Sequence, residues 1–162
     1  MREKTVSESR TEQVHIILPM DVNATFDLFG GKLMEWIDIV AAVVARRHSG
    51  HLVTTAAVDH LAFLASAALN DIIVMRGRVT YVGRTSMEIC VETFVEEPKN
   101  DGLTRKVNEA YLTMVALGAD GKPTEVPRLA LQTDAERADY EAGSRRMADR
   151  KARKDGDEDG GR

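Results

Sequence analysis

The residue types best suited to chemistry gather between Asn23 and Asp38, in the segment NATFDLFGGKLMEWID. Gly30 and Gly31 stand where an apolar helix would begin, so the unpaired N–H groups of its first turn could approach a carbonyl oxygen or a phosphate. The same glycines could instead serve close packing of that helix. Asp38 follows about two turns later and could act as a general base on water or as a nucleophile, although a salt-bridged structural aspartate is the alternative.

A second group of polar residues falls between two predicted strands. It comprises Gly83, Arg84, Thr85 and Ser86. One cation, two hydroxyl groups and adaptable backbone suit the binding of a phosphate group. A hairpin turn with a solvated arginine would account for the same residues.

Other candidates for catalysis or metal binding are weaker. The four histidines show no HExxH spacing and the single cysteine cannot form a CxxC pair, so we expect no metal site. Cys90 alternates with Glu88 and Glu92 on what we expect to be the wetter face of a strand, where negative charge opposes thiolate formation. Asp59 could assist a water molecule, and a structural hydrogen bond is the alternative.

A helix and five strands must position these residues. Alternating apolar residues predict a first strand from Glu12 to Leu18 that ends at Pro19, and nearly continuous apolar residues predict a largely buried helix from Gly30 to about Arg46. Four more strands are predicted at 52–63, 72–82, 86–95 and 104–117. One early helix followed by long consecutive strands indicates an α+β fold, in which an antiparallel sheet curls around a central helix.

The two ends of the chain lie outside this predicted domain, which spans residues 11–132. Residues 1–10 are mostly polar and are expected to be flexible. Residues 133–162 contain no Val, Ile, Leu or Phe, so we expect a solvated, charged helix followed, from Asp155, by a disordered tail.

Composition bounds the class of protein. The 162 residues suffice for one domain, and 43% hydrophobic with 30% charged residues indicates a folded globular protein. A net charge of -4 makes nucleic acid an unexpected partner, and neither a signal peptide nor a membrane-spanning segment is apparent. One cysteine excludes an internal disulfide. We therefore expect a cytoplasmic protein without membrane or nucleic-acid partners.

Taken in order, these motifs resemble those of a known family. The resemblance rests on Asn23, Gly30-Gly31, Asp38, Phe63 and the stretch Val82–Glu88. The combination is similar to the hotdog-fold acyl-CoA thioesterases, in particular the small single-domain bacterial type related to the cytosolic acyl-CoA hydrolases, from about Glu12 to Arg128. The resemblance implies hydrolysis of fatty acyl-CoA, with coenzyme A as part of the substrate and no separate cofactor.

The resemblance also implies roles for individual residues. Asp38 matches the family's catalytic carboxylate, and Asn23 matches its catalytic asparagine, which acts with the aspartate of the other subunit. Gly30 and Gly31 match the position that polarises the carbonyl group, and the segment Gly83–Ser86 matches residues that contact the nucleotide part of coenzyme A. By the same resemblance we expect a homo-oligomer, either a dimer or a trimer of dimers.

Four positions depart from the family pattern. Phe26 replaces a common glycine, and Ala65, Ser66 and Asn70 replace a basic residue, a proline and a glycine. A bulky Phe26 near the active-site turn leaves the acyl preference open. The rival interpretation is a non-catalytic acyl-CoA or fatty-acyl binding protein, which the retention of both catalytic residue types disfavours.

Overall fold

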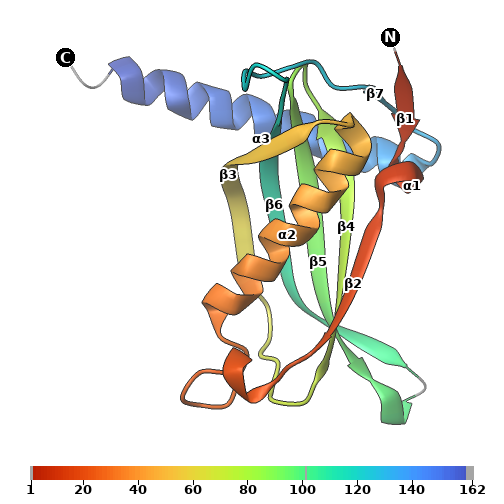
Figure 1. Cartoon of the computed structure of the whole chain (residues 1–162), viewed down its shortest axis with the longest axis vertical. Helices are drawn as coiled ribbons and strands as arrows, with labels where there is room; N and C mark the ends of the chain where they lie inside the picture. Colours follow the sequence, from red (N-terminus) through yellow and green to blue (C-terminus); the bar gives the residue numbers. More distant parts are fainter. Residues whose placement is uncertain (1, 101, 160–162) are drawn as a thin grey trace.

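A five-stranded antiparallel sheet wraps around one long helix in the computed structural model, which describes residues 2–100 and 102–159 (Figure 1). The strand order is β2-β4-β5-β6-β3. The strands are β2 (Thr11–Ile16), β3 (Leu52–Phe63), β4 (Ile72–Val82), β5 (Ser86–Glu97) and β6 (Leu103–Leu117). The long helix is α2 (Gly30–Ser49), and the short 3₁₀ turns are η1 (Pro19–Asp21) and η2 (Pro98–Asn100). The predicted α+β class, with its antiparallel sheet around a central helix, is confirmed.

The inner face of the sheet holds α2 through a continuous apolar core. Trp36, Ile37, Val40 and Val44 recur at helical spacing and are buried against the strands. Gly77 in β4 makes the close approach possible, because a Cβ there would lie 2.7 Å from Cγ1 of Val40 and 2.9 Å from Cγ2 of Val44. The expectation of a largely buried helix is therefore confirmed.

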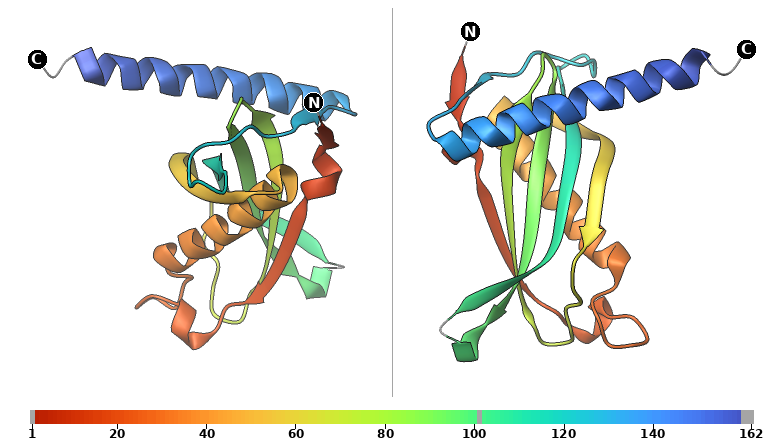
Figure 2. Two further views of the ribbon diagram at one scale, coloured as in Figure 1. Left: turned by 45° about the horizontal axis from the view of Figure 1, so that its top comes forward. Right: turned by 180° about the vertical axis from the view of Figure 1, so that it is seen from behind.

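The opposite face of the sheet is crossed by α3 (Asp134–Asp159), which lies in front of the strands when the molecule is seen from behind (Figure 2, right). Arg146 donates hydrogen bonds of 2.8 and 3.0 Å to the carboxylate of Glu88, and its Cζ lies 3.9 Å from the centre of the Tyr111 ring. Glu88 is only 1% exposed. The expectation of a solvated helix holds for the outward side of α3, where most residues are exposed, and is wrong for the side that faces the sheet. That side docks through charged and aromatic contacts that a search for apolar residues does not detect.

Two further expectations about this part of the chain need correction. α3 continues to Asp159, past the expected start of a disordered tail at Asp155, and residues 160–162 lie outside the described residues. Cys90 has no exposed surface, and it shares a strand face with Glu88, which Arg146 of α3 contacts, so that face is not the wetter one. Burial raises the pKa of the Cys90 thiol to about 12, which keeps it protonated and unreactive.

Residues 2–10 and the strand at residues 128–130 together form an ordered N-terminal clasp. Its elements are β1 (Glu3–Thr5), α1 (Val6–Ser9) and β7 (Arg128–Ala130). β1 pairs in parallel with β7, Thr5 and Glu8 form a capping box, and Val6 is buried. The expectation that residues 1–10 are flexible is therefore wrong for the described residues 2–10, because one buried apolar side chain and backbone pairing to a distant strand hold them in place.

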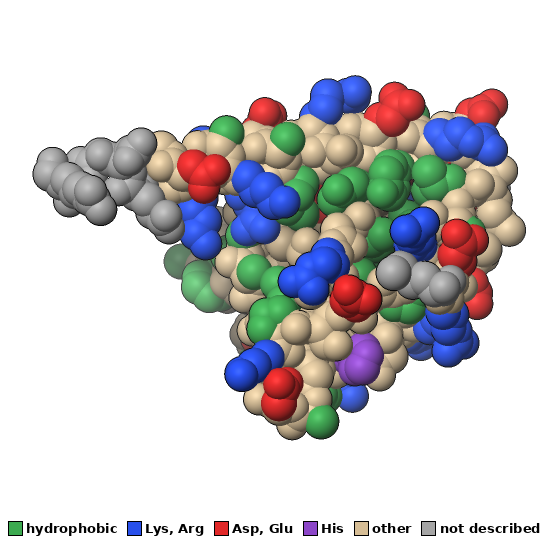
Figure 3. All heavy atoms as spheres, turned by 90° about the horizontal axis from the view of Figure 1, so that it is seen from above, with side chains coloured by type: hydrophobic (Ala, Val, Ile, Leu, Met, Phe, Trp, Pro, Cys, Tyr) green, Lys and Arg blue, Asp and Glu red, His purple; other side chains and the backbone are tan. Residues whose placement is uncertain are grey.

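The N-terminal clasp, the turn between β4 and β5 and the C-terminal end of α2 lie at one end of the molecule, which Figure 3 shows face on. Lys and Arg side chains on this end are interspersed with Asp and Glu and do not form one continuous patch. The loop that precedes α2 lies at the other end (Figure 1). This arrangement decides which site residues a single chain can bring together.

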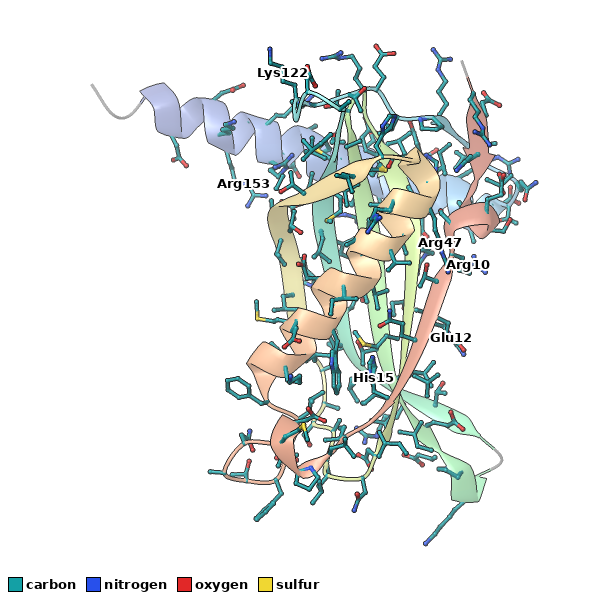
Figure 4. All side chains as sticks on the ribbon, viewed as in Figure 1. Arg10, Glu12, His15, Arg47, Lys122 and Arg153 are labelled. Atoms are coloured by element: carbon teal, nitrogen blue, oxygen red, sulfur yellow. The ribbon has the colours of Figure 1, made fainter. Side chains whose placement is uncertain are left out.

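Two histidines are held in environments that favour the neutral ring. His48 has no exposed surface, and its Nε2 lies 2.9 Å from the carbonyl oxygen of Pro127, next to the clasp. His15 points from β2 toward α2 and stacks on Trp36 with ring centres 4.3 Å apart (Figure 4). Burial lowers the pKa of both histidines below their ordinary value of 6.5.

We expect the free energy of unfolding to fall as the pH drops below about 6.5, because the unfolded histidines bind protons that the folded ones resist. Above that pH the histidines are neutral in both states and have no such effect. Urea denaturation between about pH 7.5 and 5.5 measures the dependence. The variant His48→Gln should flatten it, and an unchanged slope in that variant would contradict the assignment to His48.

Candidate active site

Asp38 and Thr55 meet at the mouth of an apolar pocket. Asp38 lies on α2 and Thr55 on β3, and the Thr55 hydroxyl donates a 2.6 Å hydrogen bond to Oδ1 of the carboxylate. The pocket has a volume of about 260 Å³. Its remaining walls are Met34, Ile37, Val58, Leu61 and Leu112. A carboxylate oriented in this way can take a proton from water, or attack a carbonyl carbon, beside an apolar chain.

The loop before α2 orients the side chain of Asn23. Val22 and Leu28 pair as an isolated β-bridge that closes the loop. Oδ1 of Asn23 accepts hydrogen bonds from the backbone N–H and the hydroxyl of Thr25, at 3.0 and 2.8 Å, and from the backbone N–H of Asp27 at 3.2 Å. Because the amide oxygen is used within the loop, the NH₂ group is the end that can donate to a ligand.

The start of α2 lines the same cavity as Asn23, with a volume of about 460 Å³. α2 begins at Gly30, as predicted, and a hydrogen bond of 3.1 Å runs from the Leu33 N–H to the Phe29 carbonyl oxygen. The N–H groups of Gly30, Gly31 and Lys32 come before this bond and have no acceptor within the helix. A Cβ at Gly31 would lie 2.6 Å from the Phe29 ring and would displace it. This helix end can hold a carbonyl oxygen or an oxyanion.

A single chain does not bring Asn23 and Asp38 together. Asp38 lies two helical turns beyond Gly30, about 12 Å along the axis of α2. The two side chains line different pockets, and Asp38 is exposed in the single chain. The predicted catalytic residues therefore lie in two separate groups, one with the carboxylate and one with the amide and the helix end, and we refer to these groups as half-sites.

The predicted coenzyme A segment forms the tight turn between β4 and β5. The Gly83 N–H donates to the Ser86 carbonyl oxygen at 2.8 Å, which places Arg84 and Thr85 at the tip. The Arg84 side chain is 77% exposed, and its Nη1 lies 3.8 Å from Oε1 of Glu125. The turn lies at the end of the molecule shown in Figure 3, opposite to the loop before α2. One chain therefore keeps this turn apart from that loop as well.

Two of the departures from the family pattern stand at left-handed backbone positions. Phe26 has a φ of 61° and Asn70 has a φ of 70°. Glycine adopts this conformation without strain and asparagine tolerates it, whereas a bulky residue does not. This explains the glycines common in the family at both positions. It also identifies Phe26 as a strained residue in the loop that orients Asn23.

We expect Phe26→Gly to have a free energy of unfolding about 1 kcal/mol higher than Phe26→Ala. Both variants remove the ring, which is 65% exposed and contributes little packing, and only alanine keeps the Cβ that strains a positive φ. Urea denaturation of the two variants beside the wild-type protein measures the difference. Equal stability of the two variants would show that the backbone of this loop is not strained.

Comparison with known proteins agrees with the class of enzyme that this fold and site suggest. The Thioesterase superfamily model matches residues 27–100, so the class is thioesterase. YkhA of Bacillus subtilis, named an uncharacterized acyl-CoA thioester hydrolase, is 35% identical over 147 residues, which cover 91% of this chain and 85% of YkhA. This chain belongs to the acyl-CoA thioester hydrolases of that superfamily.

Solved structures share the whole fold. Acyl-CoA hydrolase from Staphylococcus aureus, in complex with butyryl coenzyme A, coenzyme A and coenzyme A disulfide, matches with a TM-score of 0.91 and 34% identity over 97% of this chain and 95% of its own. A hexameric acyl-CoA thioesterase matches with a TM-score of 0.89 and 38% identity over 94% of this chain and 97% of its own. The expected hotdog fold is confirmed.

A longer relative contains a matching region. The cytosolic acyl coenzyme A thioester hydrolase of Rattus norvegicus is 34% identical over 155 residues, or 94% of this chain. The match spans 40% of the length of the rat protein. The resemblance to both bacterial and cytosolic acyl-CoA hydrolases is therefore confirmed.

Thr55 belongs to the candidate site, and sequence reasoning misses it. A threonine inside a β-branched strand carries no local signal, and its contact with Asp38 is evident only once β3 is placed against α2. Over the described ranges 2–100 and 102–159, no three His, Cys, Asp or Glu side chains are grouped to hold a metal ion. None of the helices in this part of the chain has the length and hydrophobicity needed to cross a bilayer.

Proposed function

We propose that this chain hydrolyses acyl-CoA thioesters at a site shared by two subunits. One subunit supplies Asp38 and Thr55, and the other supplies Asn23, Gly30 and Gly31. The observation that carries the proposal is the separation of the half-sites by about 12 Å along α2. Neither half suffices alone, because the carboxylate needs a carbonyl group held next to it.

The edge strand β3 offers the surface on which two subunits would pair. β3 is the last strand of the sheet, and its apolar side chains Leu52, Val58 and Phe63 are exposed. An open edge strand with exposed apolar side chains is typical of a subunit interface. Antiparallel pairing of two β3 edges about a two-fold axis would set the Leu52 end of one strand beside the Phe63 end of the other.

The same pairing would bring the coenzyme A turn toward the Asn23 pocket of the other subunit. Leu52 and Ser86 both pair with β6 near its C-terminal end, so they lie at one end of the sheet. Phe63 lies at the other end and lines the pocket that contains Asn23. Arg84 and the neighbouring hydroxyl groups of the turn, with the adaptable backbone of the glycine before them, would then hold the phosphate groups of coenzyme A.

The chemistry follows from the groups at the completed site. The N–H groups at the start of α2 polarise the thioester carbonyl and stabilise the oxyanion that forms on it. Asp38, held by Thr55, either removes a proton from the water that attacks the carbonyl carbon or attacks that carbon directly. In the first route the C–S bond breaks, the proton that Asp38 took from water passes to the sulfur, and the free acid and coenzyme A thiol are released. In the second route the C–S bond breaks and the acyl group stays on Asp38 as a mixed anhydride, while the coenzyme A thiolate takes a proton from solvent. Water then hydrolyses the anhydride, which releases the free acid and restores the carboxylate. The NH₂ group of Asn23 donates to the water or to the carbonyl oxygen.

Relatives support both the site and the assembly. Three single mutants of the Staphylococcus aureus hydrolase have been solved, in which alanine replaces an aspartate, an asparagine or a threonine. These are the residue types that we propose for the site of this chain. Two relatives are hexameric thioesterases, which supports a homo-oligomer of this chain. We propose a dimer as the catalytic unit and a trimer of dimers as the assembly.

We also propose a cytoplasmic location for this protein. Cys90 is free and buried, as suits a protein of the reducing cytoplasm.

Mixing two inactive variants tests the shared site. We expect Asn23→Ala and Asp38→Asn each to release little free thiol from acyl-CoA. A refolded equimolar mixture should recover about a quarter of the wild-type rate, because half of the randomly formed dimers contain one intact site of two. Light scattering checks that both variants assemble. Variants that assemble without any recovery would contradict the shared site, and binding of acyl-CoA without thiol release by the wild-type protein would favour a binding protein.

A further inference from the structure

Near the Asp38 carboxylate, the side chains of strand β3 do not alternate regularly between the two faces of the sheet. Its register with β6 shifts twice, and Ala56 and Asp59 are the extra residues of the two bulges. In a regular strand, Thr55 and Asp59 would share one face. In the structure Thr55, Val58 and Leu61 line the pocket, at a spacing of three residues. The bulges therefore decide which side chains of β3 face the pocket.

Asp59 is turned to the face of the sheet that α3 covers, and a contact to β6 holds it there. Its Oδ2 accepts a 2.8 Å hydrogen bond from the hydroxyl of Thr113, which is fully buried. Its Oδ1 lies 3.8 Å from Nε of Arg150 on α3, and the Asp59 side chain is 13% exposed. A hydrogen bond to a carboxylate is stronger in such a poorly hydrated place than in water. Asp59 has no backbone partner in β6 because it is the extra residue of the bulge. Its side-chain hydrogen bond to Thr113 therefore fixes its position.

We propose that Asp59 is a positioning residue for the hydrolysis reaction. Its bond to Thr113 holds the second bulge of β3, and the bulge keeps Thr55 against Asp38 while Val58 faces the pocket. The inference rests on the function proposed for Asp38. Without the anchor, the strand relaxes toward regular alternation, which moves Thr55 away from the carboxylate. A displacement of about 1 Å at a catalytic group is enough to slow a reaction by one to two orders of magnitude.

Steady-state kinetics of Asp59→Ala and Thr113→Val test the anchor. We expect each variant to lower kcat about tenfold with KM nearly unchanged, because the change moves Thr55 away from the Asp38 carboxylate and leaves the coenzyme A contacts in place. Thr113→Ser keeps the hydroxyl and should retain the wild-type kcat. Asp139→Ala is the matched control, because that acid pairs with Arg78 at 2.9 Å between α3 and β4 and leaves β3 untouched.

A double-mutant cycle separates positioning from a general loss of stability. In a Thr55→Val background, Asp59→Ala should lower kcat no further, because Thr55 is the group through which Asp59 acts. Thermal denaturation of every variant checks that the loss of kcat occurs in folded protein. Additive losses, or a wild-type kcat in Asp59→Ala, overturn the inference and leave the proposed function standing. Wild-type turnover in Asp38→Asn would overturn the proposed function itself.

Discussion

Replacing Asp38 with asparagine is expected to lower kcat for acyl-CoA hydrolysis by about 10³-fold, because an amide can neither remove a proton from water nor attack the thioester. The amide keeps the size of the carboxylate, and its oxygen can still accept the hydrogen bond from Thr55, which is 2.6 Å long in the wild-type structure. The fold and KM should therefore change little. Free-thiol release at saturating acyl-CoA measures the loss.

Glu35→Gln is the matched control for this prediction. Glu35 lies on the same helix one turn from Asp38, is exposed, and pairs with Lys32 at 3.2 Å. It is not part of the apolar pocket, so its loss should change kcat by less than about twofold. An Asp38→Asn enzyme that kept more than about one tenth of the wild-type kcat would contradict the catalytic role of this carboxylate.

Replacing Arg146 with methionine is expected to lower the free energy of unfolding by about 3 kcal/mol. The change deprives the Glu88 carboxylate, which is 1% exposed, of hydrogen bonds at 2.8 and 3.0 Å. Methionine retains apolar volume over the Tyr111 ring, so lost packing contributes little. Urea denaturation followed by circular dichroism measures the change.

Two comparison variants isolate the buried charge. Arg145→Met removes the neighbouring exposed cation and should change stability by less than about 0.5 kcal/mol. Glu88→Gln combined with Arg146→Met should recover part of the loss, because it removes the buried charge together with its partner. If Arg146→Met were as stable as Arg145→Met, the docking of α3 would not depend on this ion pair.

The sheet and its central helix could be predicted because each element carries its own hydrophobic period. The predicted strands at 52–63 and 72–82 have the bounds of β3 and β4, and the predicted helix start at Gly30 is that of α2. β5 and β6 extend the predicted strands by only one or two residues at one end. These elements bury an apolar face, and burial is what a hydrophobic pattern records.

The two chain ends could not be predicted in this way, because they dock through contacts that leave no local pattern. Arg146 and Glu88 are 58 residues apart, and each is an ordinary charged residue in its own segment. β1 is short, and it becomes a strand only through its pairing with β7. In both cases the partner comes from a distant part of the chain. The composition of each chain end alone therefore led to a wrong prediction of its structure.

The candidate site also contains residues that could be predicted from the sequence and residues that could not. The start of α2 was predictable from its glycines, and its position relative to Asp38 follows from helical geometry. Thr55 and Asp59 depend on two bulges in β3, and a bulge changes which residues share a face without changing the composition of the strand. The catalytic roles of Asn23 and Asp38 and the coenzyme A role of the turn between β4 and β5 stay predictions.

The N-terminal clasp constrains the order in which the chain can fold. Residues 3–5 of β1 pair with residues 128–130 of β7. During synthesis, β1 therefore has no partner until the whole five-stranded sheet has left the ribosome, whereas neighbouring strands such as β4 and β5 can pair as soon as both are made. Residues that are synthesised early are thus placed late, and the buried environment of His48 is completed only when the clasp closes.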